Sequence, residues 1–294
     1  MSHGSGSGVF RKVLLPPALY LVATPIGSAR DITLRALDIL ASADMIASED
    51  TRVTRHLMEL HGIALGGRPI LPYHDHNGAA QRPRLMAVLA DGQSVAYASD
   101  AGTPMVADPG FSLVRAAAEA GHTVTAAPGP SAALAALTVA GLPSDRFMFA
   151  GFSPVAKGAR RTFLKNLTKA DATVIVFESP RRLHQTLRDM VDVFGEDRLV
   201  AVCRELTKKF EQVVRGTLGD LSARYADETV KGEVVLVIDR MPDVVADQAT
   251  VEDALCRAMQ TQSVKTAAAE VADVFNLSRR DMYQLALRLR DDAE

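Results

Sequence analysis

Short apolar runs alternate with amphipathic segments along the first half of the chain. The runs at residues 18–23, 44–48, 94–98 and 122–127 predict buried strands, and apolar residues recur at helical spacing in 31–40, 51–60, 111–120 and from 130 onward. Strands that alternate with helices are typical of a parallel sheet with helices on both faces. We therefore expect an α/β domain over residues 18–150, preceded by a flexible leader at 1–17 whose first residues are rich in Ser and Gly.

The pattern changes near residue 150. Residues 151–154 read as a linker, and a predicted basic helix follows with Lys157, Arg160, Arg161, Lys165 and Lys169. Strands predicted at 173–177, 199–203, 211–216 and 233–239 lie closer together, and the last two are expected to be antiparallel. These features predict a second α/β domain over 151–242, built on a mixed sheet.

The last predicted unit, residues 243–294, has helical periodicity. Helices are expected around 267–272 and over 279–290, joined by a turn at 276–278 in which Ser278 is a candidate N-cap. The pair resembles a helix-turn-helix. The alternative is that these helices only pack on the preceding domain, because the segment carries roughly as many acidic as basic residues.

Composition and charge narrow the class of protein. The 294 residues are 48% hydrophobic and 23% charged, which is ordinary for a globular chain of two or three domains. A net charge of −2 excludes a surface that attracts nucleic acid everywhere, but basic residues are concentrated in 151–220, where a polyanion could dock. Two cysteines are too few for a disulfide framework or a Cys-built zinc site. Apolar runs stay below the ~18–20 residues that span a bilayer, and the leader lacks the apolar core of a signal peptide, so we expect a cytoplasmic protein with no membrane partner.

Three loops rich in Gly and Pro follow predicted strands, at residues 23–27, 99–110 and 127–132. Ligands bind at the carboxyl ends of strands in open α/β sheets. None of the three loops has the G-x-G-x-x-G pattern of dinucleotide binding or the phosphate-binding pattern that ends in G-K-[ST], which argues against a nicotinamide dehydrogenase and an ATPase. Taken singly, such loops fit a ligand site and plain turns equally well.

Taken in order, seven short strings carry a more specific signal. They are VATPIG at 22–27, SEDTR at 48–52, HDHN at 74–77, SDAGTP at 99–104, PGPSA at 128–132, FESPRR at 177–182 and RELTK at 204–208. With these strings the chain, over about residues 19–238, resembles the tetrapyrrole methylase superfamily of S-adenosylmethionine-dependent methyltransferases. Within it, the strings resemble the branch that methylates a ribose 2′-oxygen in 16S ribosomal RNA.

The resemblance implies two α/β domains that bind the methyl donor, S-adenosylmethionine, in a cleft between them, and a homodimer. It places donor contacts at Pro25, Gly102, Thr103, Met105, Val106, Ser131 and Ala132 in the first domain, and at Phe177 and Leu206 in the second. Asp100 either meets the amino-acid end of the donor or caps the backbone of its own loop. For Met105 and Val106 the alternative is a place in the core.

Methyl transfer to an alcohol requires alignment of the reacting atoms within about 3–3.5 Å and help in removing the hydroxyl proton. Our candidates for this chemistry are Lys208, His76, Glu178 and Arg204, with no base assigned. A lysine at Lys208 either loses its proton more easily than usual or binds phosphate, and His76 is alternatively a surface-loop histidine. No metal site is expected. The candidate contacts to RNA phosphate are Arg160, Arg161, Arg181 and Arg182.

The leading hypothesis is methylation of the 2′-oxygen of a cytidine in the decoding region of 16S rRNA, within the assembled small subunit. Aromatic residues are only 5% of the chain and Trp is absent, so grip on RNA is expected from charge and shape rather than from a stacking platform. A methyltransferase that acts on a tetrapyrrole is the first alternative. A non-catalytic RNA-binding assembly factor is the second.

Overall fold

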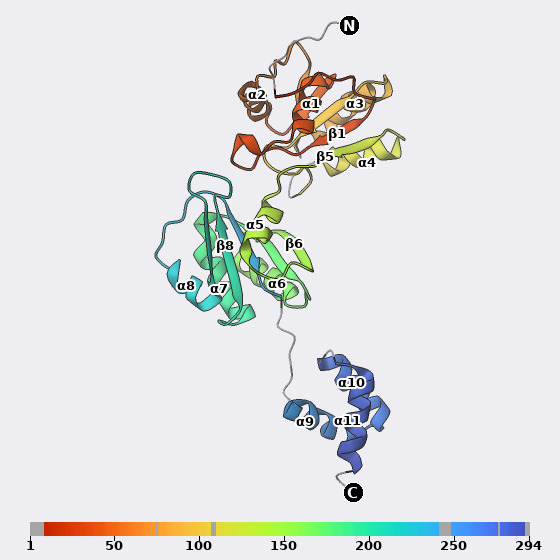
Figure 1. Ribbon diagram of the computed structural model, residues 1–294, viewed down its shortest axis with the longest axis vertical. Helices are drawn as coiled ribbons and strands as arrows, with labels where there is room; N and C mark the ends of the chain where they lie inside the picture. Colours follow the sequence, from red (N-terminus) through yellow and green to blue (C-terminus); the bar gives the residue numbers. More distant parts are fainter. Residues whose placement is uncertain (1–8, 75, 107–109, 241–247, 276, 292–294) are drawn as a thin grey trace.

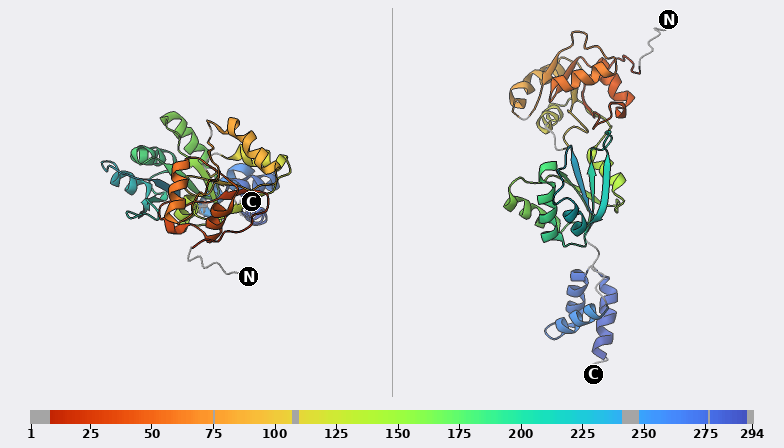
Figure 2. Two further views of the ribbon diagram at one scale, coloured as in Figure 1. Left: turned by 90° about the horizontal axis from the view of Figure 1, so that it is seen from above. Right: turned by 90° about the vertical axis from the view of Figure 1, so that its left-hand side faces the viewer.

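The computed structural model describes residues 9–74, 76–106, 110–240, 248–275 and 277–291. These residues form two five-stranded sheets, each packed against helices, followed by three C-terminal helices (Figure 1). Figures 1 and 2 show the two α/β domains one above the other, with helix α5 at their junction. The predicted two-domain α/β fold is confirmed. Several predicted features lie partly outside the described residues. They are the beginning of the leader (1–8), Asp75, residues 107–109 of the Gly- and Pro-rich loop at 99–110, and Asn276 of the predicted turn.

The first sheet is wholly parallel, in the order β3-β2-β4-β1-β5. Its strands are β1 (Leu19–Val22), β2 (Met45–Ser48), β3 (Ile70–Pro72), β4 (Val95–Ala98) and β5 (Val124–Ala127). Its helices are η1 (Ala29–Asp31), α1 (Leu34–Ser42), α2 (Thr51–Leu60), α3 (Gly78–Ala90) and α4 (Phe111–Glu119). Apolar clusters lie on both faces because successive side chains of a strand alternate: Tyr20 and Val22 join one cluster, Leu19 and Leu21 the other.

The second sheet is mixed, as predicted, in the order β6-β7-β10-β8-β9. Its strands are β6 (Phe147–Phe152), β7 (Thr173–Glu178), β8 (Leu199–Arg204), β9 (Gln212–Thr217) and β10 (Val234–Ile238). Strand β10 runs antiparallel to both β7 and β8, and β9 runs antiparallel to β8. The last two strands, β9 and β10, therefore lie on either side of β8 and each runs antiparallel to it, as predicted; they do not pair with each other.

Helices cover the second sheet on both faces. One face packs against helices α6 (Lys157–Leu167), α7 (Leu183–Phe194) and α8 (Leu218–Arg224), and a short helix, η2 (Pro180–Arg182), precedes α7. Leu164 of α6, Leu187 of α7 and Leu221 of α8 belong to one apolar cluster. The other face packs against α5 (Ala132–Ala140), whose Ala136 and Leu137 share a cluster with Ile175 of β7.

The boundary between the domains lies earlier than predicted. Helix α5 packs on the second sheet, and β6 crosses the predicted boundary at residue 150 and pairs with β7. The predicted linker at 151–154 is therefore wrong in its first half, since residues 151 and 152 complete a strand. Gly151 suggested a linker in the sequence, but in the structure its left-handed φ of +77° forms part of an irregularity inside β6.

The C-terminal helices are α9 (Gln248–Met259), α10 (Val264–Phe275) and α11 (Arg279–Asp291). They bury one shared cluster that includes Leu255, Val271 and Ala286. The Ser278 hydroxyl accepts a hydrogen bond from the Asp281 amide at 3.4 Å, as expected of an N-cap. Among the described residues, the helices are all too short or too polar to cross a membrane.

Candidate functional site

A cavity of about 390 Å³ lies between the two α/β domains. The first domain lines it with the loops that follow β1, β4 and β5, and the second with the ends of β6 and β7 and the start of β10. The lining residues are Ile26, Ala101, Gly102, Thr103, Val106, Ser131, Ala132, Phe152, Phe177, Glu178, Ser179, Pro180, Gly232, Glu233, Val234 and Val235. Most of these side chains are apolar or small, and the volume suits a small organic ligand.

Hydrogen bonds hold the three loops of the first wall together. Thr24 and Gly102 exchange backbone hydrogen bonds of 2.9 and 3.0 Å, which joins the loops after β1 and β4. The Ser99 hydroxyl donates to the Gly102 carbonyl at 2.7 Å, and the Thr103 hydroxyl donates to the Pro130 carbonyl at 2.9 Å. Gly102 has a φ of +81°, a conformation that other residues adopt only under strain. The wall is therefore fixed mainly by backbone groups.

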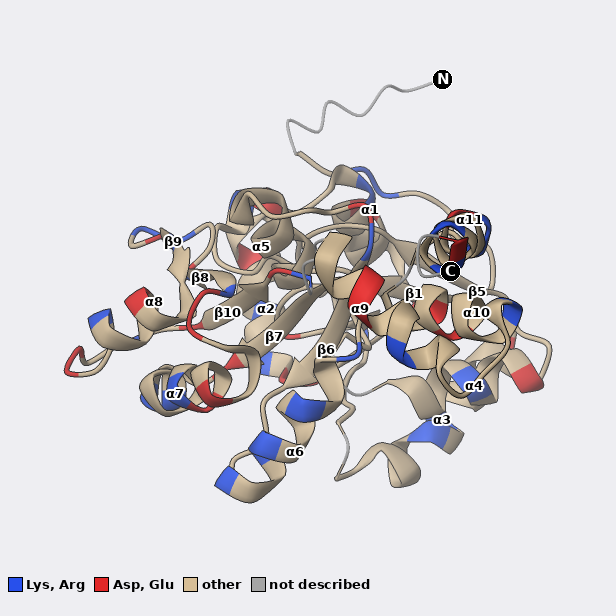
Figure 3. Ribbon diagram, turned by 90° about the horizontal axis from the view of Figure 1, so that it is seen from below, with Lys and Arg blue, Asp and Glu red and all other residues tan. Residues whose placement is uncertain are grey.

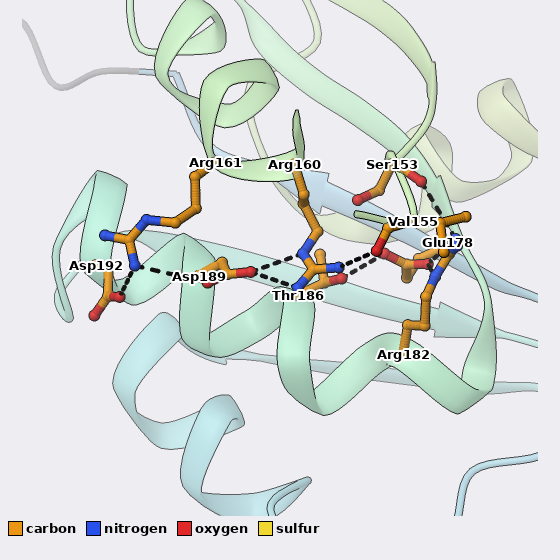
Figure 4. Close-up of polar contacts among 9 residues, drawn as sticks. All are labelled: Ser153, Val155, Arg160, Arg161, Glu178, Arg182, Thr186, Asp189 and Asp192. Carbon is orange, nitrogen blue, oxygen red and sulfur yellow. Dashed lines mark hydrogen bonds and ion pairs between the residues drawn. The ribbon is translucent and has the colours of Figure 1, made fainter. Parts of the chain in front are cut away.

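The second wall combines aromatic rings with a buried carboxylate. Phe177 packs edge-on against Phe149 and Phe152, with ring centroids 4.7 and 5.3 Å apart. Glu178 follows, and its side chain is fully buried. Arg182 donates to Glu178 Oε1 at 2.7 and 2.9 Å, and the Thr186 hydroxyl donates to Oε2 at 2.5 Å (Figure 4). Both carboxylate oxygens are thus engaged with the start of α7, so Glu178 fixes the turn of the wall.

The two domains meet where the loop after β1 contacts the loop after β8. The Ser28 amide donates to the Thr207 hydroxyl at 3.1 Å. A Cβ on Gly27 would lie 2.5 Å from Lys208 Cγ and 2.6 Å from Thr207 Oγ1, so only glycine permits this approach. Glu205 and Thr207 have positive φ values of 51° and 63°. Such backbone strain in non-glycine residues is concentrated at functional sites.

Lys208 lies in this contact as a charged group. Its ammonium donates to Glu205 at 2.9 Å and to Glu233 at 3.1 Å. Burial works to lower the pKa of Lys208, but the hydrogen bonds to Glu205 and Glu233 outweigh it, and the pKa is raised. The prediction that Lys208 loses its proton easily is therefore not supported. Because Glu233 lines the cavity, Lys208 is held one side chain away from it.

The structure brings together part of the predicted donor site. Six predicted donor contacts line the cavity: Gly102, Thr103, Val106, Ser131, Ala132 and Phe177. Glu178, one of the catalytic candidates, lines it as well. Ile26, Phe152 and residues 232–235 also line it, and sequence reasoning missed them.

Four predicted donor contacts lie outside the lining. Pro25 precedes the lining residue Ile26, and Met105 precedes Val106 with a φ of +69° and an exposed side chain. Leu206 is buried in the cluster between α5 and the second sheet. Asp100 accepts a hydrogen bond from the Asp50 amide at 2.8 Å, which joins its loop to the one after β2, whereas the alternative stated for Asp100 was to cap its own loop.

The remaining catalytic candidates lie around the cavity but do not line it. Arg204, at the end of β8, donates to the Gln212 side chain and to the Lys231 carbonyl, each at 3.3 Å. His76 is exposed in the loop after β3, the edge strand of the first sheet. Strand β2 separates β3 from β4, whose loop lines the cavity, and His76 is not among the lining residues.

The candidate RNA contacts divide by exposure. The prediction that Arg160 contacts RNA phosphate is wrong, because Arg160 is buried and donates to Asp189 at 2.6 and 2.7 Å (Figure 4). Arg182 is largely committed to Glu178. Arg161 is half-exposed and paired with Asp192 at 2.7 Å, whereas Arg181 is exposed beside the lining residue Pro180. Of these four predicted contacts, Arg161 and Arg181 are accessible to a phosphate.

The cavity fits the methyl donor suggested by the sequence. Ile26, Val106 and Phe177 offer apolar surface for an adenine ring. Ser131, at the N-cap of α5, makes no capping hydrogen bond through its side chain among the described residues, so the first turn of α5 can receive a carboxylate. Within the described ranges no group of three or more His, Cys, Asp or Glu side chains is arranged to hold a metal ion.

Comparisons with known proteins agree with this geometry. Residues 18–222 match the tetrapyrrole (corrin/porphyrin) methylases, and residues 245–290 match the RsmI C-terminal HTH domain. The chain is 48% identical over 278 residues to the ribosomal RNA small subunit methyltransferase I of Mesorhizobium japonicum, with 94% of each chain covered. It is 42% identical over 271 residues to the protein of the same name from Xylella fastidiosa, with 91% of this chain and 98% of that protein covered.

Solved structures with low sequence identity share the fold. Uroporphyrin-III C-methyltransferase from Thermus thermophilus matches with a TM-score of 0.54 at 21% identity, over 75% of this chain and 94% of that chain. Diphthine synthase matches with a TM-score of 0.59 at 18% identity, over 75% of this chain and 89% of that chain. At these identities the likeness concerns the fold alone.

Proposed function

Because the chain belongs to the tetrapyrrole (corrin/porphyrin) methylase family, we propose that it methylates a ribose 2′-oxygen in the RNA of the small ribosomal subunit. Members of this family take the methyl group from S-adenosylmethionine, so the chain is an S-adenosylmethionine-dependent methyltransferase. Its curated relatives are named ribosomal RNA small subunit methyltransferases and match along nearly their whole length.

The observation that carries the proposal is a small-molecule cavity with cationic side chains beside it. The cavity can hold the methyl donor, and Arg181 is exposed next to its lining residue Pro180. Elsewhere in the second domain, helix α6 carries the exposed Lys157 and Lys165 and the half-exposed Arg161, and Figure 3 shows Lys and Arg positions repeating along this helix. Phosphate contacts of this kind position a nucleic acid without reading its sequence.

The reaction is an in-line displacement. The ribose 2′-oxygen forms a bond to the methyl carbon, the bond from that carbon to sulfur breaks, and the hydroxyl proton leaves to a base or to water. Residues Gly102, Thr103 and Ser131 hold the donor in our proposal, since they line the first wall and are tied to one another through their loops. Alignment of the reacting groups by such fixed walls is a large part of catalysis.

Lys208 is proposed as a permanent cation rather than as a base. Its raised pKa keeps the ammonium protonated at neutral pH, and its partner Glu233 is an exposed residue of the cavity. An incoming phosphate or the developing charge on the ribose oxygen can therefore attract Lys208 away from Glu233. Arg204 and His76 stay candidates for contact with the RNA.

The finer parts of the proposal come from the resemblance in sequence. They are a cytidine in the decoding region as target, the assembled subunit as substrate, a homodimer as the active form, and the cytoplasm as location. The tail supports a nucleic-acid substrate, because residues 245–290, which include helices α9 and α10 and most of α11, match the RsmI C-terminal HTH domain.

The test is a methylation assay with radiolabelled S-adenosylmethionine and small subunits from cells that lack this gene. Naked 16S RNA and uroporphyrinogen serve as parallel acceptors. We expect label in subunit RNA that survives alkaline hydrolysis as a resistant dinucleotide, which identifies 2′-O-methylation. Label in uroporphyrinogen alone would favour the tetrapyrrole alternative, and the absence of donor binding would favour the assembly factor.

A matched pair of glycine variants ties the activity to the cavity. Gly102 and Gly62 both have left-handed backbone, with φ values of +81° and +70°, but only Gly102 lines the cavity. Gly102→Ala should weaken donor binding and abolish transfer, whereas Gly62→Ala should retain both. If both variants bind the donor and transfer the methyl group equally well, the activity does not depend on this cavity.

A further inference from the structure

Phe152 exposes an aromatic face at the mouth of the cavity. Its side chain lines the cavity, yet the residue is 60% exposed. Most large apolar residues of the second sheet are buried, and the neighbouring Phe177 is only partly accessible. Phe111 and Phe210 are exposed to a similar extent, so exposure alone does not mark a site; Phe152 differs from them because its exposed ring also lines the cavity.

A local irregularity of β6 places the ring there. Strand pairing runs from Phe149 opposite Ile175 to Phe152 opposite Phe177, so β6 has one residue more than β7 over this stretch. Gly151 absorbs the extra residue with its left-handed φ. In a regular strand, residue 152 would face away from Phe149, because successive side chains alternate. The bulge turns Phe152 back to the face of Phe149 and Phe177, which is the face of the cavity.

The backbone after Phe152 is anchored on both sides. The Ser153 amide donates to the Phe177 carbonyl at 3.0 Å, and the Ser153 carbonyl accepts from Arg182 at 3.3 Å (Figure 4). Arg182 in turn holds Glu178, so the position of Phe152 depends on the same network that fixes the second wall. The backbone hydrogen bonds therefore fix the position of the Phe152 ring, which packs edge-on with Phe177 and leaves most of its surface exposed.

We propose that Phe152 is a positioning residue on which the nucleobase of the acceptor nucleotide stacks. The inference deepens the proposed function and rests on it. A ribose 2′-oxygen reaches a donor inside the cavity only if its nucleotide leaves the surrounding RNA stack, and an aromatic side chain replaces the stacking that is lost. The base then lies on Phe152 while its ribose points toward the donor, and nearby Arg181 is free to meet the phosphate.

The sequence offers a clean test, because the chain contains no tryptophan. Phe152→Trp introduces a single tryptophan at the cavity mouth, and Phe147→Trp introduces one at the opposite end of the same strand as a matched control. We expect small subunits from cells lacking the gene to quench the fluorescence of Phe152→Trp and not that of Phe147→Trp. Quenching by S-adenosylmethionine alone, with no further change on adding subunits, would assign the ring to the donor and overturn the proposal.

Kinetics of a second variant provide an independent measurement. Phe152→Leu keeps an apolar side chain but removes the flat face, so the KM for subunits should rise about 5- to 150-fold, as for loss of one stacked base. The donor Kd should stay within about twofold, which also reports that the variant is folded, and Phe152→Tyr should restore the KM. An unchanged KM with an active wild type would overturn the inference alone. A wild type that labels no RNA would overturn the proposed function and the inference with it.

Discussion

The ion pair between Arg160 and Asp189 gives a sharp test of how the second domain is stabilised. Only 3% of the Arg160 side chain and 5% of the Asp189 side chain are exposed. Arg160 places two nitrogens 2.6 and 2.7 Å from one carboxylate oxygen, and it also donates to the Val155 carbonyl. Arg160→Met would leave the carboxylate buried, with only the guanidinium of Arg161 nearby at 3.9 Å. Breaking such a pair from one side costs about 3–5 kcal/mol.

The adjacent Arg161 is the matched control. Its guanidinium pairs with Asp192 at 2.7 Å and lies farther from Asp189, at 3.9 Å, and the Arg161 and Asp192 side chains are 37% and 53% exposed. Arg161→Ala removes the same charge from the same helix and should cost less than about 1 kcal/mol, because water and salt screen a surface pair. The two variants should rank in the opposite order when RNA binding is measured. Arg161→Ala should weaken binding of the ribosomal subunit more than Arg160→Met and should reduce the salt dependence of binding by about one phosphate contact.

Hydrogen exchange read by mass spectrometry can follow α6 and α7 separately from the other domains. We expect Arg160→Met to lower the opening free energy of these helices by about 3–5 kcal/mol, limited by the global stability of the domain. Adding Asp189→Leu should recover much of this loss, because no charge is then left buried. A loss below about 1 kcal/mol in Arg160→Met, or an equal loss in Arg161→Ala, would refute the reasoning.

Three further predictions concern the contact between the domains. Lys208→Arg should retain most of the methyl-transfer rate and Lys208→Ala should lose it, because the proposed role requires a permanent cation. If the pH dependence of the wild-type rate instead shows a titration near neutral pH that disappears in Lys208→Arg, Lys208 acts as a base. The hydrogen bond from Lys208 lowers the pKa of Glu205, so their contact stabilises the fold above the ordinary carboxyl value of 4.5 and loses this contribution as the pH falls through the lowered value. Exchange protection of residues 205–208 should fall there in the wild type and be less pH-dependent in Glu205→Gln. Gly27→Ala should separate the loops and weaken donor binding in calorimetry, whereas Gly158→Ala, which has open space around it, should leave donor binding unchanged.

The fold was largely predictable because buried strands of a parallel sheet are nearly continuous apolar runs. Where the prediction failed, local sequence conflicted with tertiary context. Helix α3 was not predicted, since Pro83 lies inside it and its apolar residues do not form a clear stripe. The end of β6 was read as a linker because Gly151 marks a turn in most sequences, whereas here it marks a bulge.

The first wall was more predictable than the second, for a reason of strand direction. The rule that ligands bind at carboxyl ends of parallel strands pointed to the loops that carry Gly102 and Ser131, and the resemblance in sequence added Phe177 on the second wall. The rule could not find residues 232–235, because β10 is antiparallel to its neighbours and brings its amino end to the cavity. Charge counting failed in the same way at Arg160, since composition does not tell which arginines are buried.

The contact between the domains shows how the two walls keep their separation. Met105, Glu205 and Thr207 are the non-glycine residues with positive φ in the described part of the chain, and all three lie in loops beside the cavity. Such conformations cost about 1–3 kcal/mol each and persist only where neighbouring groups hold them. Here the Glu205 amide donates to the Glu233 carbonyl at 3.0 Å, and the Thr207 amide donates to the Glu211 carboxylate at 2.5 Å. The loops are therefore set before any ligand arrives, so that free energy from RNA binding can go into moving the nucleotide rather than into ordering the walls.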